Sequence, residues 1–263
     1  MFEAFLMGLV EGLTEFLPIS STGHLILLGE ALDFRGPPGK VFEISIQLGA
    51  ILAVMVLFRA RLLDLALHAW RPGTPQRNLA VNLLLAFLPA MVLGATLHGI
   101  ITEMLFNPWV VSVALILGGI AIIVIERRVR VPTIRTLEEM GPGAALLVGF
   151  GQALAMIPGT SRSGATIITA LLCGVERRAA AEFSFLLAIP TMLAAAAYSL
   201  LKVRNEISAD GLGLIAVGFA TAFVVALLTV RWVMGVIGRI GFTPFGWYRI
   251  ALGAVMLVVL SLG

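Results

Sequence analysis

Residues 11–24 gather two carboxylates, several hydroxyls and an imidazole inside an otherwise apolar N-terminal segment. Glu11 and Glu15 are four residues apart, so on a helix they project from the same face. Such a pair can hold a divalent cation, act as a general base or acid, or relay protons in a transporter. Because polar groups are costly in hydrocarbon, this stretch is predicted to line a cavity.

The same stretch offers a nucleophile and a base. His24 follows Ser21 by three residues, so the imidazole could activate the hydroxyl. The alternative is a histidine held only by structural hydrogen bonds. Pro18 is expected to end the first helix, and the hydroxyl residues after it suit the start of a second.

A second polar stretch begins after Pro158-Gly159 and is also expected at a helix start. Unpaired N–H groups and the positive end of the helix dipole make such a start suitable for anions. Arg162 adds a planar guanidinium that matches phosphate oxygens in pairs. The alternative is that Arg162 only neutralises Glu11 or Glu15 in a structural ion pair.

Composition indicates a polytopic membrane protein. Of the 263 residues, 59% are hydrophobic and 13% are charged, and the mean hydropathy is +1.03. Cys173 is the single cysteine, which excludes an internal disulfide and a cysteine-based zinc site. The N-terminus has no basic region, so no cleaved signal peptide is expected. The net charge of +3 is small, and no nucleic-acid partner is expected.

The apolar runs predict an all-α polytopic fold with six transmembrane helices plus two re-entrant helical hairpins. Segments 4–30 and 145–172 are the hairpins, because each contains a break and each half is too short to cross a bilayer. Residues 59–78 are predicted to be a loop. The six spans are predicted at about 42–58, 79–99, 108–126, 182–201, 212–231 and 244–262.

The chain also predicts an internal repeat within a single membrane domain, 1–263. A shift of 141 positions places 11–52 on 152–193 without a gap, with Ser20 on Ser161 and Gly23 on Gly164. The repeats are about 1–128 and 142–263, joined by a basic loop at 127–141. Three spans per half is an odd number, so the second half must enter the membrane from the opposite side, as an inverted-topology repeat.

Basic residues support this topology, because cytoplasmic loops are rich in Lys and Arg. Under it, 12 of the 18 basic residues fall on one face and 4 on the other. The basic face is therefore expected to be cytoplasmic, with the site opening outward. Arg249 is expected to extend its charge from a span end toward the interface. The four on the outer face are Arg35, Lys40, Lys202 and Arg204.

Both polar stretches resemble the two signatures of the undecaprenyl pyrophosphate phosphatase family, the bacitracin-resistance type, and the resemblance extends over essentially the whole chain. It implies an enzyme of the bacterial cytoplasmic (inner) membrane that removes the terminal phosphate of a C55 polyprenyl pyrophosphate and so regenerates the lipid carrier of cell-wall synthesis. It also implies a need for Mg²⁺ or Ca²⁺.

The two breaks are expected to meet near mid-membrane, so that Glu15, Ser21 and His24 face Arg162 across one pocket, and the resemblance carries roles over by position. Glu11 and Glu15 would be metal ligands or the base, Ser21 a nucleophile, His24 the acid–base histidine and Arg162 the phosphate clamp. The surrounding substrate-binding residues would be Ser20, Thr22, Ser161, Ser163, Gly164 and Thr166.

Broken helices in an inverted repeat are also typical of transporters, so a transporter or flippase of polyprenyl phosphate lipids is the alternative. In either case, the lipid tail is expected in an apolar groove, with segments 43–57 and 183–200 as candidate walls. A homodimer is compatible with the sequence, which does not determine the oligomeric state.

Overall fold

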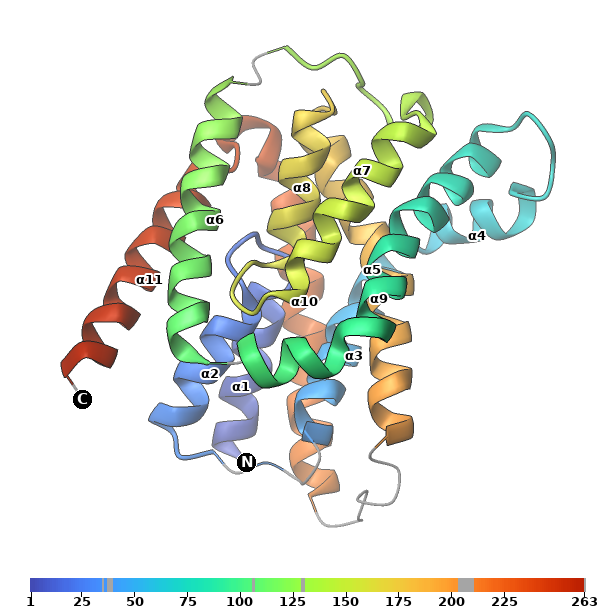
Figure 1. The fold of residues 1–263 in the computed structure, drawn as a ribbon. Coiled ribbons are helices and arrows are strands. Elements are labelled where there is room, and N and C mark those ends of the chain that lie inside the picture. The colour runs from blue at the N-terminus through green and yellow to red at the C-terminus, as the bar shows by residue number, and fades with distance from the viewer. Residues whose placement is uncertain (35, 37–39, 106, 129–130, 203–210, 263) are drawn as a thin grey trace.

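The structure is a computed structural model that describes residues 1–34, 36, 40–105, 107–128, 131–202 and 211–262, without the side chains of 97–104. Its described residues form helices joined by turns and short connections, with one isolated bridge between Ile134 and Val175 (Figure 1). Arg35, Arg130 and Arg204, three of the basic residues counted above, lie outside the described residues.

The described residues of the first half of the chain form six α-helices. They are α1 (Phe2–Thr14), α2 (Ser21–Ala31), α3 (Val41–Leu57), α4 (Arg59–His68), α5 (Pro75–Leu105) and α6 (Pro108–Arg128). Where the structure describes the second half, it contains five α-helices and two short 3₁₀ turns. They are η2 (Leu137–Glu139), α7 (Pro142–Ala153), η3 (Leu154–Met156), α8 (Arg162–Leu172), α9 (Arg177–Lys202), α10 (Leu212–Ile240) and α11 (Thr243–Leu262).

Among the described residues, 5 helices are long and apolar enough to cross a membrane. They are α5, α6, α9, α10 and α11. Helices α3 and α4 are bent by 72° relative to each other, and this pair makes a sixth span if it is counted as one. The all-helical, multi-pass membrane architecture expected from the composition is thereby confirmed.

The two broken segments have their outer ends at opposite ends of the molecule. In Figure 1, α1 begins and α2 ends at the lower end of the molecule, whereas α7 begins and α8 ends at the upper end. The turns between the helices meet at mid-height. Ser163 of α8 donates a 2.8 Å hydrogen bond to the carbonyl of Leu17, which joins the second break to the first.

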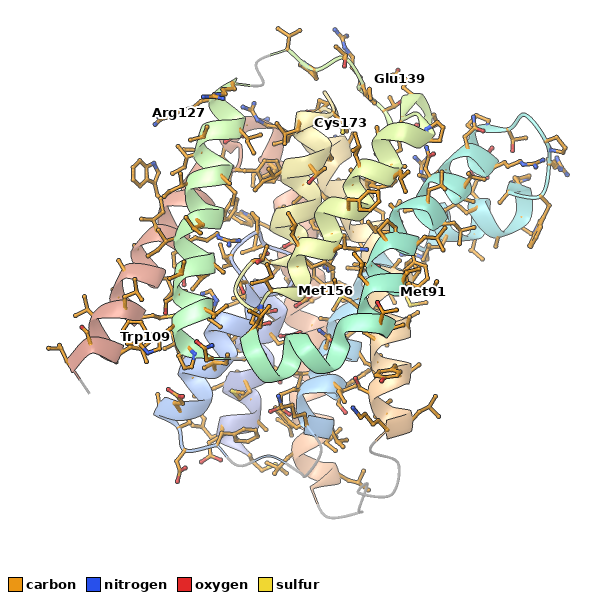
Figure 2. The ribbon with its side chains drawn as sticks, viewed as in Figure 1. Met91, Trp109, Arg127, Glu139, Met156 and Cys173 are labelled. Atoms are coloured by element: carbon orange, nitrogen blue, oxygen red, sulfur yellow. The ribbon has the colours of Figure 1, made fainter. Side chains whose placement is uncertain are left out.

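The connections near residues 127–141 and 173–177 lie together at the upper end. Figure 2 shows Arg127, Glu139 and Cys173 there, while Trp109, at the other end of α6, lies low in the view. Helix α6 therefore runs most of the height of the molecule, and the basic connection after it faces the same end as the connection after α8.

Both breaks use the same unusual backbone conformation. Ser20 and Ser161, which the 141-residue shift aligns, each have φ of 70°, and each directly precedes a helix. A positive φ is uncommon for a residue with a side chain and costs free energy. The 141-residue shift thus pairs two serines that have the same strained φ.

The first helix of each broken segment packs against a long helix of the other half. Gly8 of α1 lies against the backbone of Gly218 in α10, and a Cβ there would collide with its carbonyl oxygen. Gly149, which the shift aligns with Gly8, lies against the backbone of Ala86 in α5, where a Cβ would come within 2.6 Å of the carbonyl oxygen. Small residues let these helices approach closely.

Aromatic side chains form the core around the breaks. Phe16 and Phe185 are both fully buried and pack edge to face, with ring centroids 5.6 Å apart. Phe42 and Phe183, aligned by the shift, are also fully buried. The polar groups of the breaks are therefore held against a rigid apolar core.

The predicted loop 59–78 is partly wrong, because residues 59–68 form α4 and α5 already begins at Pro75. The helix-breaking residues of this connection are confined to 72–75, so nothing interrupts a helix before them. Arg61 of α4 forms a 2.5 Å ion pair with Glu138, which ties the helix to the connection after α6.

Candidate active site

A small polar pocket of about 170 Å³ lies where the two breaks meet. The first break contributes Glu15 and the hydroxyl residues at the start of α2, and the second contributes the segment before α8 together with Arg162. Helices α3 and α9 close the pocket. Its lining residues are Glu15, Ser20, Ser21, Thr22, Gln47, Ala155, Pro158, Gly159, Ser161, Arg162 and Met192.

Glu15 joins the two halves of the pocket. Its Oε2 accepts a 2.5 Å hydrogen bond from the hydroxyl of Ser21, and its Oε1 is 3.4 Å from Nη2 of Arg162. Arg162 also donates from Nη1 to the carbonyl of Ser184 at 3.0 Å and lies 5.7 Å from the ring of Phe16. The sequence-based expectation that Glu15 and Ser21 face Arg162 is therefore met.

Glu11 lies deeper than Glu15, one turn earlier in α1, and is 1% exposed. Its Oε1 is buried and has no hydrogen-bond partner in the described part of the chain. Within those described residues, no group of three or more His, Cys, Asp or Glu side chains is placed to hold a metal ion. A cation here would therefore have two carboxylates and nearby hydroxyls as protein ligands, which are the hard oxygen donors that Mg²⁺ and Ca²⁺ accept.

The residues expected to surround the phosphate divide into two groups. Ser20, Thr22 and Ser161 line the pocket, whereas Ser163, Gly164 and Thr166 do not. Ser161 accepts a hydrogen bond from the N–H of Gly164 and so caps α8 at its N-terminus. The hydroxyl of Thr166 lies 2.7 Å from that of Ser184. Ser163, Gly164 and Thr166 therefore belong to the first turns of α8, the helix that begins with Arg162.

His24 is not among the residues lining the pocket, and its ring contacts Ser20 and Tyr248. Its Nδ1 is 2.8 Å from the carbonyl oxygen of Ser20, so Nδ1 carries the hydrogen and donates it. Its Nε2 is 2.6 Å from the hydroxyl of Tyr248, and the two rings are nearly parallel. With Nδ1 protonated, a neutral His24 accepts the Tyr248 hydrogen at Nε2. The structure thus does not bring His24 together with Arg162.

Three further residues lie at the site. Gln47 lines the pocket, and its four-residue spacing from Glu43 had left open either a place beside the site or an interhelical hydrogen bond. Ser184 supplies the carbonyl that holds Arg162, and no pattern indicated it. Arg249 was expected to reach the interface, but its exposure is 0% because carbonyls of both breaks and of α6 surround its guanidinium.

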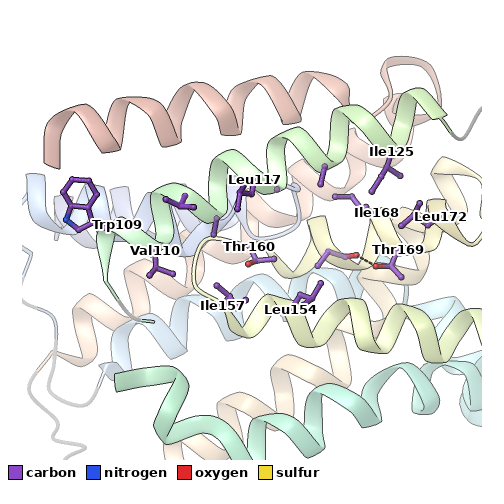
Figure 3. Close-up of a pocket in the computed structure, with 15 residues that line it drawn as sticks. Trp109, Val110, Leu117, Ile125, Leu154, Ile157, Thr160, Ile168, Thr169 and Leu172 are labelled. Carbon is purple, nitrogen blue, oxygen red and sulfur yellow. Dashed lines mark hydrogen bonds between the residues drawn. The ribbon is translucent and has the colours of Figure 1, made fainter. Parts of the chain in front are cut away.

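A separate apolar groove of about 650 Å³ runs along α6 beside the second broken segment (Figure 3). Leu154, Ile157 and Thr160 line it, while residues between them in the chain, such as Pro158 and Gly159, line the polar pocket. The segment 154–161 is thus a wall shared by both. The other lining residues are Trp109, Val110, Val113, Ala114, Leu117, Gly118, Ala121, Ile125, Ala165, Ile168, Thr169 and Leu172.

The segments expected to wall a lipid groove, 43–57 and 183–200, do not line this one. Several of their apolar residues, among them Ile46, Phe183 and Leu187, are instead fully buried in the core, whereas others, such as Leu52 and Leu193, are exposed. An apolar run alone cannot distinguish a helix that faces lipid from one that packs against its neighbours.

Comparison with known proteins adds family information to this geometry. The family described as "Bacitracin resistance protein BacA" matches residues 4–255. Undecaprenyl-diphosphatase 2 of Paramagnetospirillum magneticum is 56% identical over 260 residues, covering 99% of both chains. The undecaprenyl-diphosphatases of Parvibaculum lavamentivorans and Sphingopyxis alaskensis are 52% and 50% identical, over 99% and 97% of this chain and 97% and 96% of their own. The chain therefore belongs to the bacitracin resistance protein BacA family.

Proposed function

We propose that this protein is an undecaprenyl-diphosphatase, which hydrolyses the terminal phosphate of a C55 polyprenyl pyrophosphate and releases the monophosphate lipid carrier. The contact of Glu15 with both Ser21 and Arg162 in one polar pocket is the observation that carries the proposal. The pocket combines the Ser21 hydroxyl, the Glu15 carboxylate as a base and the Arg162 guanidinium as a positively charged group that can bind phosphate. Relatives that align over nearly the whole chain bear the name of this activity.

Phosphate binding is assigned to the second break. The guanidinium of Arg162 and the first N–H groups of α8 bind the non-bridging oxygens of the diphosphate. Holding these oxygens stabilises the charge that builds up on the transferred phosphoryl group, which is the main requirement of phosphoryl transfer.

Nucleophilic attack on the terminal phosphorus is assigned to residues of the first break. The oxygen of Ser21, or of a water held beside it, forms a bond to the terminal phosphorus while its proton passes to Oε2 of Glu15. The bond from that phosphorus to the bridging oxygen breaks, and polyprenyl monophosphate leaves. If Ser21 attacks, Glu15 passes its proton to the departing monophosphate. Water then attacks the phosphoserine, Glu15 takes the proton of that water and returns it to the Ser21 oxygen as the bond from phosphorus to that oxygen breaks, and inorganic phosphate leaves.

His24 is assigned to a second acid–base step rather than to the activation of Ser21. Its Nε2 is engaged by Tyr248 and its Nδ1 by the carbonyl of Ser20. To act on a substrate oxygen, His24 must first give up its hydrogen bond with the Tyr248 hydroxyl. Glu15 needs no such exchange, because it already contacts the Ser21 hydroxyl.

A divalent cation, Mg²⁺ or Ca²⁺, fits the donors of Glu11 and Glu15, and the unpartnered Oε1 of Glu11 supports its binding there. When bound, it would neutralise charge on the diphosphate oxygens.

The proposed topology is an inverted repeat with both hairpins re-entrant, in the bacterial inner membrane, with the pocket opening to the outer face. The matching conformations of Ser20 and Ser161 and the opposed outer ends of the two broken segments support it. The basic connection at 127–141 is then cytoplasmic. The proposed site residues all come from one chain, so the chemistry does not require a homodimer.

The polyprenyl tail is assigned to the apolar groove along α6. Its lining is almost entirely apolar, and its wall at 154–161 is also a wall of the polar pocket (Figure 3). A substrate that bends around the tip of this segment places its diphosphate beside Arg162 and its chain in the groove. The burial of isoprenoid carbons against this lining would contribute to affinity for long-chain substrates.

The test is release of inorganic phosphate from C55 polyprenyl pyrophosphate by the purified protein in detergent, where there is no membrane to cross. Hydrolysis that depends on Glu15, shown by its loss in Glu15→Gln, is the expected result. Protein that binds the lipid without releasing phosphate, and moves it across vesicle membranes instead, would replace the phosphatase with the transporter alternative.

A further inference from the structure

Arg249 of α11 is a fully buried cation that the proposed chemistry has not used so far. Its side chain is 0% exposed. Among the described residues, no carboxylate lies within ion-pair distance of its guanidinium, although Arg61, Arg162 and Arg177 all have such partners. A buried charge without a counter-ion is costly, so it is retained only where other groups or a ligand compensate it.

Five backbone carbonyls surround the guanidinium, and they come from three different parts of the chain. Nη1 donates to Pro18 and Thr160 at 3.2 and 2.9 Å, Nη2 to Gly159 and Ala114 at 3.0 and 3.1 Å, and Nε to Leu115 at 3.3 Å. Pro18 and Gly159 are equivalent positions of the two repeats. Arg249 therefore joins both breaks to each other and to α6.

These contacts determine which way the peptide groups of the second break face. A trans peptide is planar, and its N–H points opposite to its carbonyl. Because the carbonyl of Thr160 points to Arg249, the N–H of Ser161 points to the other side, where Ser161 lines the polar pocket. Within the described chain, the N–H groups of Ser161, Arg162 and Ser163 form no backbone hydrogen bond of their own.

We propose that Arg249 is a positioning residue for the diphosphate, because it turns the N–H of Ser161 toward the pocket and holds the second break, with the start of α8, against the first. Its charge, which no carboxylate in the described structure neutralises, adds positive potential behind the wall formed by Gly159 and Ser161. The inference rests on the proposed phosphatase function and names the part of the fold that binds the terminal phosphate.

The role requires arginine in particular. A lysine ammonium has three donors at one point, whereas the guanidinium spreads five donors across a plane and reaches carbonyls on three sides. Space for that plane is provided by Gly118 of α6. A Cβ at Gly118 would collide with Nη2 of Arg249 and lie 2.8 Å from its Cζ.

Two variants of the full-length protein in detergent test the proposal. Arg249→Lys keeps the charge but loses the planar set of guanidinium donors. Gly118→Ala keeps Arg249 but displaces its guanidinium. In both, KM for polyprenyl pyrophosphate and the inhibition constant of inorganic pyrophosphate should rise together, by about tenfold, as expected for loss of hydrogen bonds to a charged group. Gly235→Ala is the matched control, since a Cβ at Gly235 meets nothing within 4 Å.

If Arg249 only supported packing, the variants would yield less folded protein, with KM and the pyrophosphate inhibition constant unchanged in what remains. That result overturns the proposal, and Gly118→Ala decides the question if Arg249→Lys does not fold. Thermal stabilisation by inorganic pyrophosphate gives a readout without turnover. A wild type that pyrophosphate stabilises, but that hydrolyses no lipid, would refute the phosphatase function while leaving the effect of Arg249 measurable.

Discussion

The hydroxyl of Ser21 donates a 2.5 Å hydrogen bond to Oε2 of Glu15 across the break between α1 and α2. The two residues are six positions apart, and only the turn at residues 15–19, followed by the left-handed conformation of Ser20, brings them together. A carboxylate that accepts a hydroxyl hydrogen is the arrangement needed to activate that hydroxyl for attack. The experiments below follow from this contact and from the residues around it.

Ser21→Ala should lower kcat by roughly 10³-fold if the Ser21 oxygen is the nucleophile, because a reacting group is removed. Phosphate release in detergent and trapping of labelled phosphate on the protein measure this. Ser45→Ala is the control, since the Ser45 hydroxyl only donates to the carbonyl of Val41 within α3. Near-normal turnover of Ser21→Ala would exclude the phosphoserine route and leave direct attack by water.

Arg162→Lys should lower kcat/KM by about 10²-fold, because an ammonium cannot contact Glu15, the carbonyl of Ser184 and phosphate oxygens from one plane. Steady-state kinetics on the lipid substrate measure the loss. The exposed Arg178 provides the matched control as Arg178→Lys. Equal kinetics in the two variants would contradict the assignment of Arg162 as a phosphate clamp.

Glu11→Gln should fold normally but require a higher Mg²⁺ or Ca²⁺ concentration for half-maximal activity. The 141-residue shift places Gln152 on Glu11, and Gln152 is 2% exposed, so the fold accommodates a buried amide at the position aligned with Glu11. The amide oxygen is a neutral and weaker ligand than a carboxylate. Activity measured against cation concentration tests this, and an unchanged cation requirement would remove Glu11 from the site.

Ala121→Phe should raise KM for the C55 substrate by several-fold while leaving a short-chain polyprenyl pyrophosphate unaffected, because Ala121 lines the apolar groove and the larger side chain fills it. Ala251→Phe, at an exposed position of α11 outside the groove, controls for added bulk. For the wild type and each variant, KM is compared between the two substrate chain lengths. If KM rises equally for both, the tail lies elsewhere.

Glu126→Ala should destabilise the fold by about 3 kcal/mol without changing KM. The carboxylate of Glu126 accepts hydrogen bonds from the N–H groups of Phe242 and Thr243, from the Thr243 hydroxyl and from Arg177, and so connects α6, α9 and the start of α11. Thermal unfolding in detergent measures the change, with the exposed Glu30→Ala as control. A Tm equal to wild type would show that this junction is not important for stability.

Much of the site could be anticipated from residue types and spacing. Pro18 and the Pro158-Gly159 pair marked the breaks, and the hydroxyl residues after them marked helix starts that α2 and α8 confirm. The prediction that Glu15 and Ser21 meet Arg162 also held. These features are local, or they follow from a repeat that aligns two stretches of the chain.

Other features could not be read from the sequence. His24 was expected beside Arg162, but its ring is directed to Tyr248, 224 positions away in the chain. The direction of a side chain at a helix start depends on the partner that the neighbouring helix offers, and nothing near His24 in the sequence identifies Tyr248. The apolar groove along α6 was not anticipated for a related reason, since an apolar run does not show which helix will cover it.

Composition, hydropathy and the positions of the two polar breaks are enough to indicate a helical membrane protein, because they depend on the spacing of residues along one chain. The meeting of those breaks around the buried guanidinium of Arg249 depends instead on how α11 packs against α6. An arginine near the end of an apolar run normally extends to the interface. Here three carbonyls of the breaks and two of α6 accept hydrogen bonds from the guanidinium. Only the packed fold brings these five carbonyls to one place.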